Sequence, residues 1–258
     1  MTQMSDLAQR RFSGLDRLYG TVGAQRIRAS HVAVVGIGGV GSWAAEALAR
    51  SGVGRITLID LDHVAESNIN RQIHAQDSTL GQAKVLAMRE RIHSYAPECV
   101  VTCVDDFVEP ANWPALLPAD VSAVIDACDA IKAKTAMAAW ATANKSIFIS
   151  VGAAGGKRLA HAVDIADLSA TTHDPLLAQL RYRLRKEHGA PREGKKIGVT
   201  CVFSREAVSQ PDASCMVDAD QSSDGTLNCS GYGSLVTVTA TFGQCAAGWV
   251  MNEICKKN

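Results

Sequence analysis

Short apolar runs alternate with segments of helical pattern between residues 31 and 151. The runs predict buried strands, at residues 31–37, 55–60, 100–104, 121–126 and 146–151. The segments between them predict helices, at residues 42–51, 80–95 and 132–144. Strands that alternate with helices are typical of an α/β fold with a doubly wound, mostly parallel, Rossmann-like sheet. Residues 1–30 look helical and mixed in polarity, which predicts an N-terminal helical arm packed outside this sheet.

The pattern becomes less regular in the last third of the chain. Residues 161–165 predict one more strand. Asp174 followed by Pro175 predicts a helix start, because Asp caps helices and Pro fits their first turn. Residues 209–228 are polar without a clear period, so we expect disorder there. Residues 234–254 predict a final helix.

The final helix has two interpretations, since residues 225–252 carry no charged side chain. A run of that length could cross a bilayer, but its Ser, Thr, Asn and Gln side chains are polar for a lone span. We therefore expect a buried helix that covers one face of the sheet, and no membrane association. The chain then divides into the N-terminal arm (1–30), a Rossmann-like core (31–156) and a C-terminal extension (157–258) whose last helix packs on the same domain.

Net charge does not indicate a polyanionic partner, because 26 basic residues balance 26 acidic ones. A local basic patch is compatible with that balance. The N-terminus carries charged residues before any long apolar run, so we expect no secretory signal and a cytoplasmic protein. None of the eight cysteines forms a C-x-x-C pair, which argues against a structural zinc site.

The glycine motif Gly36-x-Gly38-x-x-Gly41 follows the first predicted strand and opens a helix, as in a dinucleotide-binding turn. Gly36 permits the tight turn, Gly38 lets the backbone approach phosphate, and Gly41 allows the helix to pack closely on the strand. Asp60, at the end of the second strand, is placed for a ribose hydroxyl. NAD-dependent oxidoreductases share this motif, and a glycine turn without a ligand is a further alternative.

Residues downstream of the motif make the pattern more specific. With them, the chain resembles the ubiquitin-activating-enzyme superfamily, in the bacterial branch that contains the molybdopterin and thiamine sulfur-carrier adenylyltransferases. This resemblance extends to about residue 150 and rests on Gly36–Ser42 with its extra Gly39, Asp60-x-Asp62, Asn68–Gln72, Lys84 and Asp126–Asp129.

Members of this superfamily bind ATP rather than NAD and adenylate a carboxylate with Mg²⁺. The resemblance implies that Lys84 faces the triphosphate as a point charge, and that Arg71 acts as an arginine finger in trans across a homodimer. It also implies that Asp129 holds Mg²⁺, and that Asn68 and Gln72 orient phosphate or ribose. These residue types suit attack on an α-phosphate, where positioning and electrostatic stabilisation dominate catalysis.

The implied ATP site draws on many parts of the N-terminal half. Its members are Gly36, Gly38, Gly39, Gly41, Asp60, Asp62, Asn68, Arg71, Gln72, Lys84 and Asp126. Taken alone, Arg71 could form a surface salt bridge and Lys84 could lie on a solvated helix face. At these spacings together, the residues favour adenylation over an NAD-dependent oxidoreductase or a non-catalytic nucleotide-binding scaffold, in which Arg71 and Lys84 would have no task.

A second resemblance runs nearly end to end. The chain lacks the two C-x-x-C zinc hooks of the sulfur-carrier activators and instead resembles the bacterial tRNA threonylcarbamoyladenosine dehydratases. The matching segments are Arg11-Phe12, Arg17–Gly20, Asn70–Ala75, Asp105–Val108, Gly198–Ser204 and Thr237–Gly243. In that family ATP activates the carboxylate of the threonylcarbamoyl group on the adenosine beside the anticodon, and loss of the activated oxygen as AMP lets the side chain close into a ring. The alternative is an adenylyltransferase that activates the C-terminus of a sulfur-carrier protein.

A tRNA substrate should contact a local basic surface, which makes residues 157–258 a substrate-binding extension. The tRNA-binding cluster that we predict comprises Arg181, Arg183, Arg185, Lys186, Arg192, Lys195 and Lys196. An ordinary solvated helix face is its alternative. Cys229 is a candidate nucleophile, because superfamily relatives use a cysteine to take over the activated group, although ring closure needs no protein nucleophile. Relatives linked to sulfur transfer also suggest a cysteine-desulfurase partner.

Overall fold

The computed structural model describes residues 6–192, 194–211 and 232–256. Within these residues one sheet of seven strands has the order β3-β2-β1-β4-β5-β7-β6. The strands are β1 (His31–Val35), β2 (Arg55–Ile59), β3 (Val100–Val104), β4 (Ala123–Asp126), β5 (Ile147–Val151), β6 (Val163–Asp167) and β7 (Thr200–Ser204). Every neighbouring pair is parallel except β6 and β7, so the mostly parallel sheet predicted from the sequence is confirmed.

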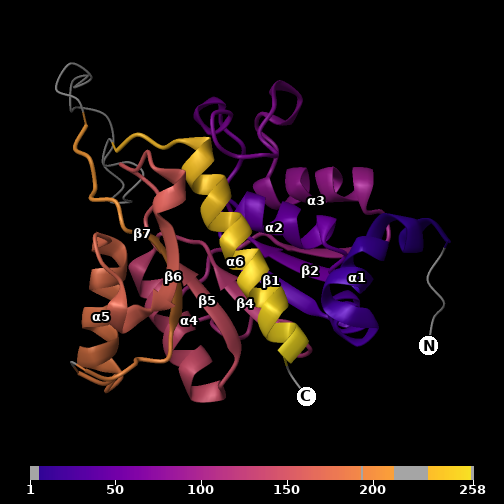
Figure 1. The fold of residues 1–258 in the computed structure, drawn as a ribbon. Coiled ribbons are helices and arrows are strands. Elements are labelled where there is room, and N and C mark those ends of the chain that lie inside the picture. Colours follow the sequence, from indigo (N-terminus) through magenta and orange to yellow (C-terminus); the bar gives the residue numbers. More distant parts are fainter. Residues whose placement is uncertain (1–5, 193, 212–231, 257–258) are drawn as a thin grey trace.

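Helices cover both faces of the sheet (Figure 1). One face packs against α1 (Asp6–Ala29), α2 (Gly41–Arg50), α3 (Lys84–Tyr95) and α6 (Val236–Lys256). The other face packs against α4 (Ile131–Asn144) and α5 (Pro175–Glu187). Short 3-10 helices lie in the connections: η1 (Glu66–Asn68), η2 (Asp77–Thr79), η3 (Ala160–Ala162) and η4 (Leu168–Ala170). This two-sided cover explains why the central strands are continuous apolar runs, since both of their faces are buried.

The N-terminal arm is α1, which bends at Gly20 (φ +70°) and lies against α6. Tyr19 Oη donates a hydrogen bond to Asn252 Oδ1 at 2.9 Å. Arg26 Nη1 donates to the Cys255 carbonyl at 2.7 Å. The arm therefore packs outside the sheet, as predicted, and its contacts tie the beginning of the chain to its last helix.

Helix α6 crosses the same face of the sheet as α2 and lies beside it (Figure 1). The two helices approach most closely at Gly243, where a Cβ would lie 2.4 Å from the Val40 carbonyl oxygen. Only glycine fits this crossing. The final helix thus covers one sheet face, as expected, and no helix in the described part of the chain is long and apolar enough to cross a membrane.

Strand β7 is the element that the sequence pattern did not predict. It pairs in parallel with β5 and antiparallel with β6. Two strands of the 157–258 extension therefore continue the sheet of the core, and the boundary proposed at residue 156 does not separate two sheets. The division into domains stays a prediction. Most of the polar segment 209–228 lies outside the described residues.

Candidate nucleotide-binding site

The predicted site residues gather where the sheet reverses its direction of winding. Strands β1 and β4 are neighbours at the centre of the sheet. The chain leaves β1 for α2 on one face, and it leaves β4 for α4 on the other face. In open α/β sheets, ligands bind in the crevice outside the carboxyl ends of the strands at such a switch point. The glycine turn after β1 and the turn 126–129 after β4 both begin there.

The glycine turn has two positions at which only glycine fits. Gly36 has φ +85°, and a Cβ there would lie 2.8 Å from the Cys128 backbone nitrogen. A Cβ on Gly41 would lie 1.7 Å from the Gly36 carbonyl oxygen. Both glycines therefore do what the motif predicted: Gly36 makes the turn, and Gly41 lets α2 pack closely against it.

The backbone beside Gly38 is open. A Cβ on Gly38 would meet only Gln72 Nε2, at 3.9 Å, whereas a Cβ on Gly39 would contact Thr239 Cγ2 of α6 at 3.2 Å. Ser42 Oγ and Gln72 Oε1 are buried and have no hydrogen-bond partner among the described residues. Open backbone at a helix N-terminus, with unpaired polar atoms nearby, fits the phosphates of a nucleotide.

Asp60 holds the glycine turn in place. Its Oδ2 accepts a hydrogen bond from the Ile37 N–H at 2.5 Å, and its Oδ1 accepts from the Asp62 N–H at 2.8 Å. Burial raises the pKa of Asp60, although the charge of Lys84 and these two hydrogen bonds oppose the rise. A carboxylate has further lone pairs, so a ribose contact is compatible with this role and stays a prediction.

Lys84 is the first residue of α3 and is buried, which is rare for a lysine without a partner. Its Nζ lies 2.6 Å from Oδ2 of Asp62, whose side chain is 54% exposed. The Lys84 N–H also donates to the Asp62 carbonyl, at 2.9 Å. The ammonium therefore lies next to the carboxyl ends of the strands, and the alternative of a solvated helix face does not describe it.

Arg71 and Asn68 come from the turn around η1. Asn68 Oδ1 accepts a hydrogen bond from the Ala65 N–H at 3.0 Å, which fixes the start of this turn. Arg71 Nη1 donates to the Ser67 carbonyl at 2.6 Å and to Asn70 Oδ1 at 2.9 Å. Burial lowers the pKa of Arg71. In the described part of the chain Arg71 has no carboxylate partner, so it is not held in a surface salt bridge.

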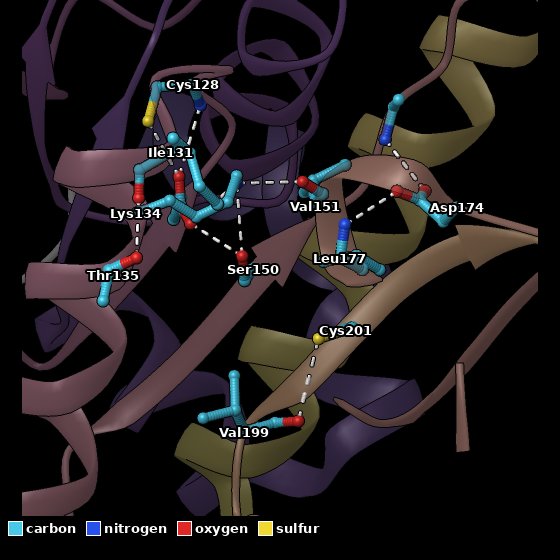
Figure 2. Close-up of polar contacts among 12 residues, drawn as sticks. Cys128, Ile131, Lys134, Thr135, Ser150, Val151, Asp174, Leu177, Val199 and Cys201 are labelled. Atoms are coloured by element: carbon cyan, nitrogen blue, oxygen red, sulfur yellow. Dashed lines mark hydrogen bonds and ion pairs between the residues drawn. The ribbon is translucent and has the colours of Figure 1, made fainter. Parts of the chain in front are cut away.

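Asp126 ends β4 and is fully buried beside Lys134 of α4, a residue that the sequence pattern did not single out (Figure 2). Lys134 Nζ lies 2.8 Å from Asp126 Oδ2, and Ser150 Oγ donates to the same oxygen at 2.7 Å. Burial lowers the pKa of Lys134, but the charge of Asp126, its hydrogen bond and the nearby thiols of Cys128 and Cys201 together outweigh this effect, and the pKa is raised overall. The Asp126 carboxylate has no exposed atom and is already paired, which leaves it little room to contact ATP directly. That contact stays a prediction.

Asp129 is partly exposed in the turn that follows β4. Among the residues that the structure describes, no group of three or more His, Cys, Asp or Glu side chains could hold a metal ion. A single carboxylate at this edge is compatible with Mg²⁺, which commonly completes its shell with phosphate oxygens and waters. The assignment of Mg²⁺ to Asp129 stays a prediction.

Two cysteines bear on whether the reaction uses a protein nucleophile. Cys229, the candidate nucleophile, lies outside the described residues. Cys128 lies in the turn after β4, where burial raises the pKa of its thiol well above the ordinary value. Since the thiolate is the nucleophilic form, Cys128 is poorly suited to covalent catalysis.

The predicted tRNA-binding cluster lies on α5 and on the loop between α5 and β7 (Figure 1). This loop lies at the amino ends of the parallel strands, opposite the glycine turn. The loop, residues 188–199, leads into the amino end of β7, whereas the glycine turn follows the carboxyl end of β1. Arg181 is engaged internally, because its Nη1 donates to the carbonyls of Leu168 and Thr171 at 2.9 and 3.1 Å. The exposed members of the cluster are Lys186, Arg192, Lys195 and Lys196.

Known relatives match this chain over nearly its whole length. The ThiF family matches residues 12–258. The chain is 44% identical to the tRNA threonylcarbamoyladenosine dehydratase of Escherichia coli (strain K12), over 98% of this chain and 97% of that protein. It is 41% identical to the protein of the same name from Haemophilus influenzae, over 98% and 96%.

Solved structures agree with this similarity. The crystal structure of the E. coli dehydratase in complex with ATP has a TM-score of 0.88 and 43% identity, over 98% of this chain and 97% of that chain. The E. coli molybdopterin-synthase adenylyltransferase is 33% identical, but over 58% of this chain and 61% of that protein. The chain therefore belongs to the ThiF family, and within it to the group that contains the tRNA threonylcarbamoyladenosine dehydratases.

Proposed function

We propose that this protein is an ATP-dependent, AMP-forming enzyme that acts on tRNA threonylcarbamoyladenosine beside the anticodon. It adenylates the carboxylate of the threonylcarbamoyl group, which then closes into a ring with net loss of water. The observation that carries the proposal is the similarity to the E. coli dehydratase over 98% of the chain. The open cradle at Gly38 and the buried Lys84 supply a site that suits ATP.

The first step forms one phosphorus–oxygen bond and breaks another. A carboxylate oxygen of the substrate attacks the α-phosphorus of ATP, and pyrophosphate leaves. Backbone N–H groups of the glycine turn and the start of α2 orient the phosphates. Lys84 and Arg71 stabilise the negative charge that builds on the phosphoryl oxygens, Lys84 as a compact ammonium and Arg71 as a planar guanidinium.

The second step closes the ring. An internal nucleophile of the substrate's own side chain attacks the activated acyl carbon, and AMP leaves with the former carboxylate oxygen. Across both steps the substrate loses the atoms of one water, while ATP becomes AMP and pyrophosphate. This balance needs no protein nucleophile, and Cys229 remains the candidate if one takes part.

Further assignments belong to the same proposal. Mg²⁺ neutralises phosphate charge when it is bound, and Asp129 is the partly exposed carboxylate that we assign to it. Two copies associate, so that Arg71 of one copy reaches the site of the other. The enzyme works in the cytoplasm, where its tRNA substrate is found. A cysteine-desulfurase partner stays a prediction that rests on family resemblance.

Activation of a sulfur-carrier protein is the weaker alternative. The E. coli molybdopterin-synthase adenylyltransferase matches only 58% of this chain. The chain also has no C-x-x-C pair, and such pairs form the zinc hooks of the sulfur-carrier activators.

The test is ATP turnover by the purified protein with Mg²⁺ and tRNA that carries or lacks the threonylcarbamoyl group. We expect AMP and pyrophosphate with the modified tRNA alone, and a nucleoside lighter by the mass of one water. AMP formation that ignores tRNA and instead needs a small protein ending in Gly-Gly overturns the proposal. Bound NAD with no AMP formation overturns it as well.

A further inference from the structure

A buried lysine joins the ends of two central strands. Lys134 of α4 is fully buried, and its Nζ donates to Asp126 Oδ2 at 2.8 Å, to the Val151 carbonyl at 2.9 Å and to Ser150 Oγ at 3.2 Å (Figure 2). These contacts use all three N–H groups of the ammonium. They connect α4 to the carboxyl ends of β4 and β5 at once.

Asp126 passes this connection on to the turn that follows β4. Its Oδ2 accepts from Lys134 and Ser150, and its Oδ1 accepts from the backbone N–H of Cys128 at 3.3 Å and from Cys128 Sγ at 3.1 Å. The carboxylate is therefore fixed by one oxygen and holds the turn with the other. Asp129 is the next residue of that turn.

The same turn forms the support of the glycine turn. A Cβ on Gly36 would lie 2.8 Å from the Cys128 nitrogen and 2.9 Å from the Ala127 carbonyl carbon, and a Cβ on Gly41 would lie 3.3 Å from Ala127 Cβ. The backbone of Ala127 and Cys128 thus packs against the start of the phosphate-binding turn, and the Ala127 side chain packs against its end. A displacement of the one turn must displace the other, since close-packed interiors leave no slack.

We propose that Lys134 is a positioning residue for ATP: through Asp126 it sets the turn 127–129, and through that turn it sets the glycine turn. Lys134 itself has no exposed atom, so it acts through the residues that it holds. The inference rests on the proposed use of this site for ATP. It does not depend on which carboxylate is adenylated.

Stability alone does not account for this arrangement. Replacement of a buried ion pair by well-packed hydrophobic residues of similar volume often leaves the free energy of unfolding unchanged or raises it. The hydrogen bonds of Lys134 to two strands fix the geometry of the strand ends. Catalysis is sensitive to such geometry, because a misplacement of about 1 Å can cost roughly a hundredfold in rate.

The test compares two variants with wild type. Lys134→Met/Asp126→Asn replaces the ion pair with neutral groups of similar size, which avoids an unpaired buried charge. Ser150→Ala removes one hydrogen bond to Asp126 and is the milder variant. The control is Glu46→Gln, which weakens a different buried carboxylate cluster, formed by Glu46 of α2 with Arg50, Arg91 and Tyr95. Thermal unfolding gives stability, and calorimetric titration gives the dissociation constant of ATP with and without Mg²⁺.

We expect both variants to fold and to bind ATP more weakly, by roughly tenfold for the neutral pair and by a smaller factor for Ser150→Ala. The loss should be larger with Mg²⁺, since the displaced turn carries Asp129. Glu46→Gln should lower the unfolding temperature and leave ATP affinity unchanged. Wild-type affinity in both variants would overturn the inference, as would a loss in Glu46→Gln equal to theirs. If wild type binds ATP but forms no AMP with modified tRNA, the proposed function fails while the Lys134 comparison remains valid.

Discussion

The Lys84 ammonium lies 2.6 Å from the Asp62 carboxylate, and the lysine is buried while the aspartate is half exposed. Asp62 therefore occupies the position where an anionic ligand would gain most from this charge. ATP phosphates that approach Lys84 must either share its ammonium with the Asp62 carboxylate or displace that carboxylate. The pair keeps the buried ammonium compensated when no nucleotide is bound, since an unpaired buried charge is costly.

Lys84→Met should abolish most of the adenylation rate. Loss of one preorganised group that stabilises transition-state charge typically costs roughly 100- to 1,000-fold in kcat. The measurement is exchange of labelled pyrophosphate into ATP in the presence of modified tRNA. Asp62→Asn is the matched variant, because it keeps the shape and removes the competing charge, and it should retain far more activity. A Lys84→Met enzyme with near wild-type kcat would contradict the assignment of Lys84.

Gly38→Ala should leave the fold intact and weaken ATP binding. A Cβ at Gly38 has no protein atom nearer than 3.9 Å, so the added methyl group enters the space that we assign to phosphate. The dissociation constant of ATP and the unfolding temperature are the two measurements. Gly248→Ala is the control, because nothing lies within 4 Å of a Cβ at this position in α6. Equal ATP affinity in wild type and Gly38→Ala would place the phosphates elsewhere.

His74 should make the protein less stable as the pH falls. Burial, together with the charges of Lys84 and Arg91, lowers the pKa of His74 to about 4. His74 therefore binds a proton below about pH 6.5 in the unfolded chain, but only below about pH 4 in the folded chain. This difference lowers the free energy of unfolding by an amount on the order of 3 kcal/mol once the pH has fallen below about 4. Both ring nitrogens of His74 lack a hydrogen-bond partner among the described residues, so no hydrogen bond from these residues stabilises the charged imidazolium.

The measurement is denaturant unfolding at a series of pH values for wild type and His74→Gln. The variant should lose about one proton's worth of pH dependence between pH 4 and pH 6.5. His161→Gln, which changes an exposed histidine, should keep the wild-type slope. The assignment fails if His74→Gln and wild type show the same slope.

Lys195→Gln/Lys196→Gln should weaken tRNA binding without changing ATP affinity. Both lysines are exposed in the loop before β7, at the edge of the sheet opposite the glycine turn. If both contact phosphate groups, the slope of log affinity against log salt should become shallower by about 1.5. The kcat at saturating tRNA should not change, since the loop is remote from the site. Arg10→Gln/Arg17→Gln on α1 is the control, and an equal effect there would mean that only net charge matters.

The parts of the fold that the sequence predicted are those with a local signal. Gly36, Gly41 and the apolar runs on either side of them are constrained by contacts within one βαβ unit. Strand β7 was missed because its five residues are recognised as a strand only through pairing with β5 and β6, which are distant in sequence. Arg181 was predicted to face tRNA because an internal bond to the Leu168 and Thr171 carbonyls leaves no trace in composition.

Lys134 shows the same limit at the site. In an alanine-rich helix a lysine has the appearance of a solvated residue. Its burial follows from the pairing of β4 with β5, which brings Ser150 and the Val151 carbonyl next to Asp126. By contrast, Lys84 was predicted because its spacing from the glycine motif is shared by a whole superfamily.

The contact of α6 with α2 at Gly243 has a consequence for synthesis of the chain. The glycine turn and its supporting residues leave the ribosome early, but α6, which packs beside them, is made more than 100 residues later. Until residue 256 has emerged, the sheet face under α6 stays open to solvent, and α1 lacks the partner that Tyr19 and Arg26 bind. A nascent chain that ends after β5 should therefore expose this apolar face to solvent, and competence to bind nucleotide should arise only after α6 has emerged and packed on it.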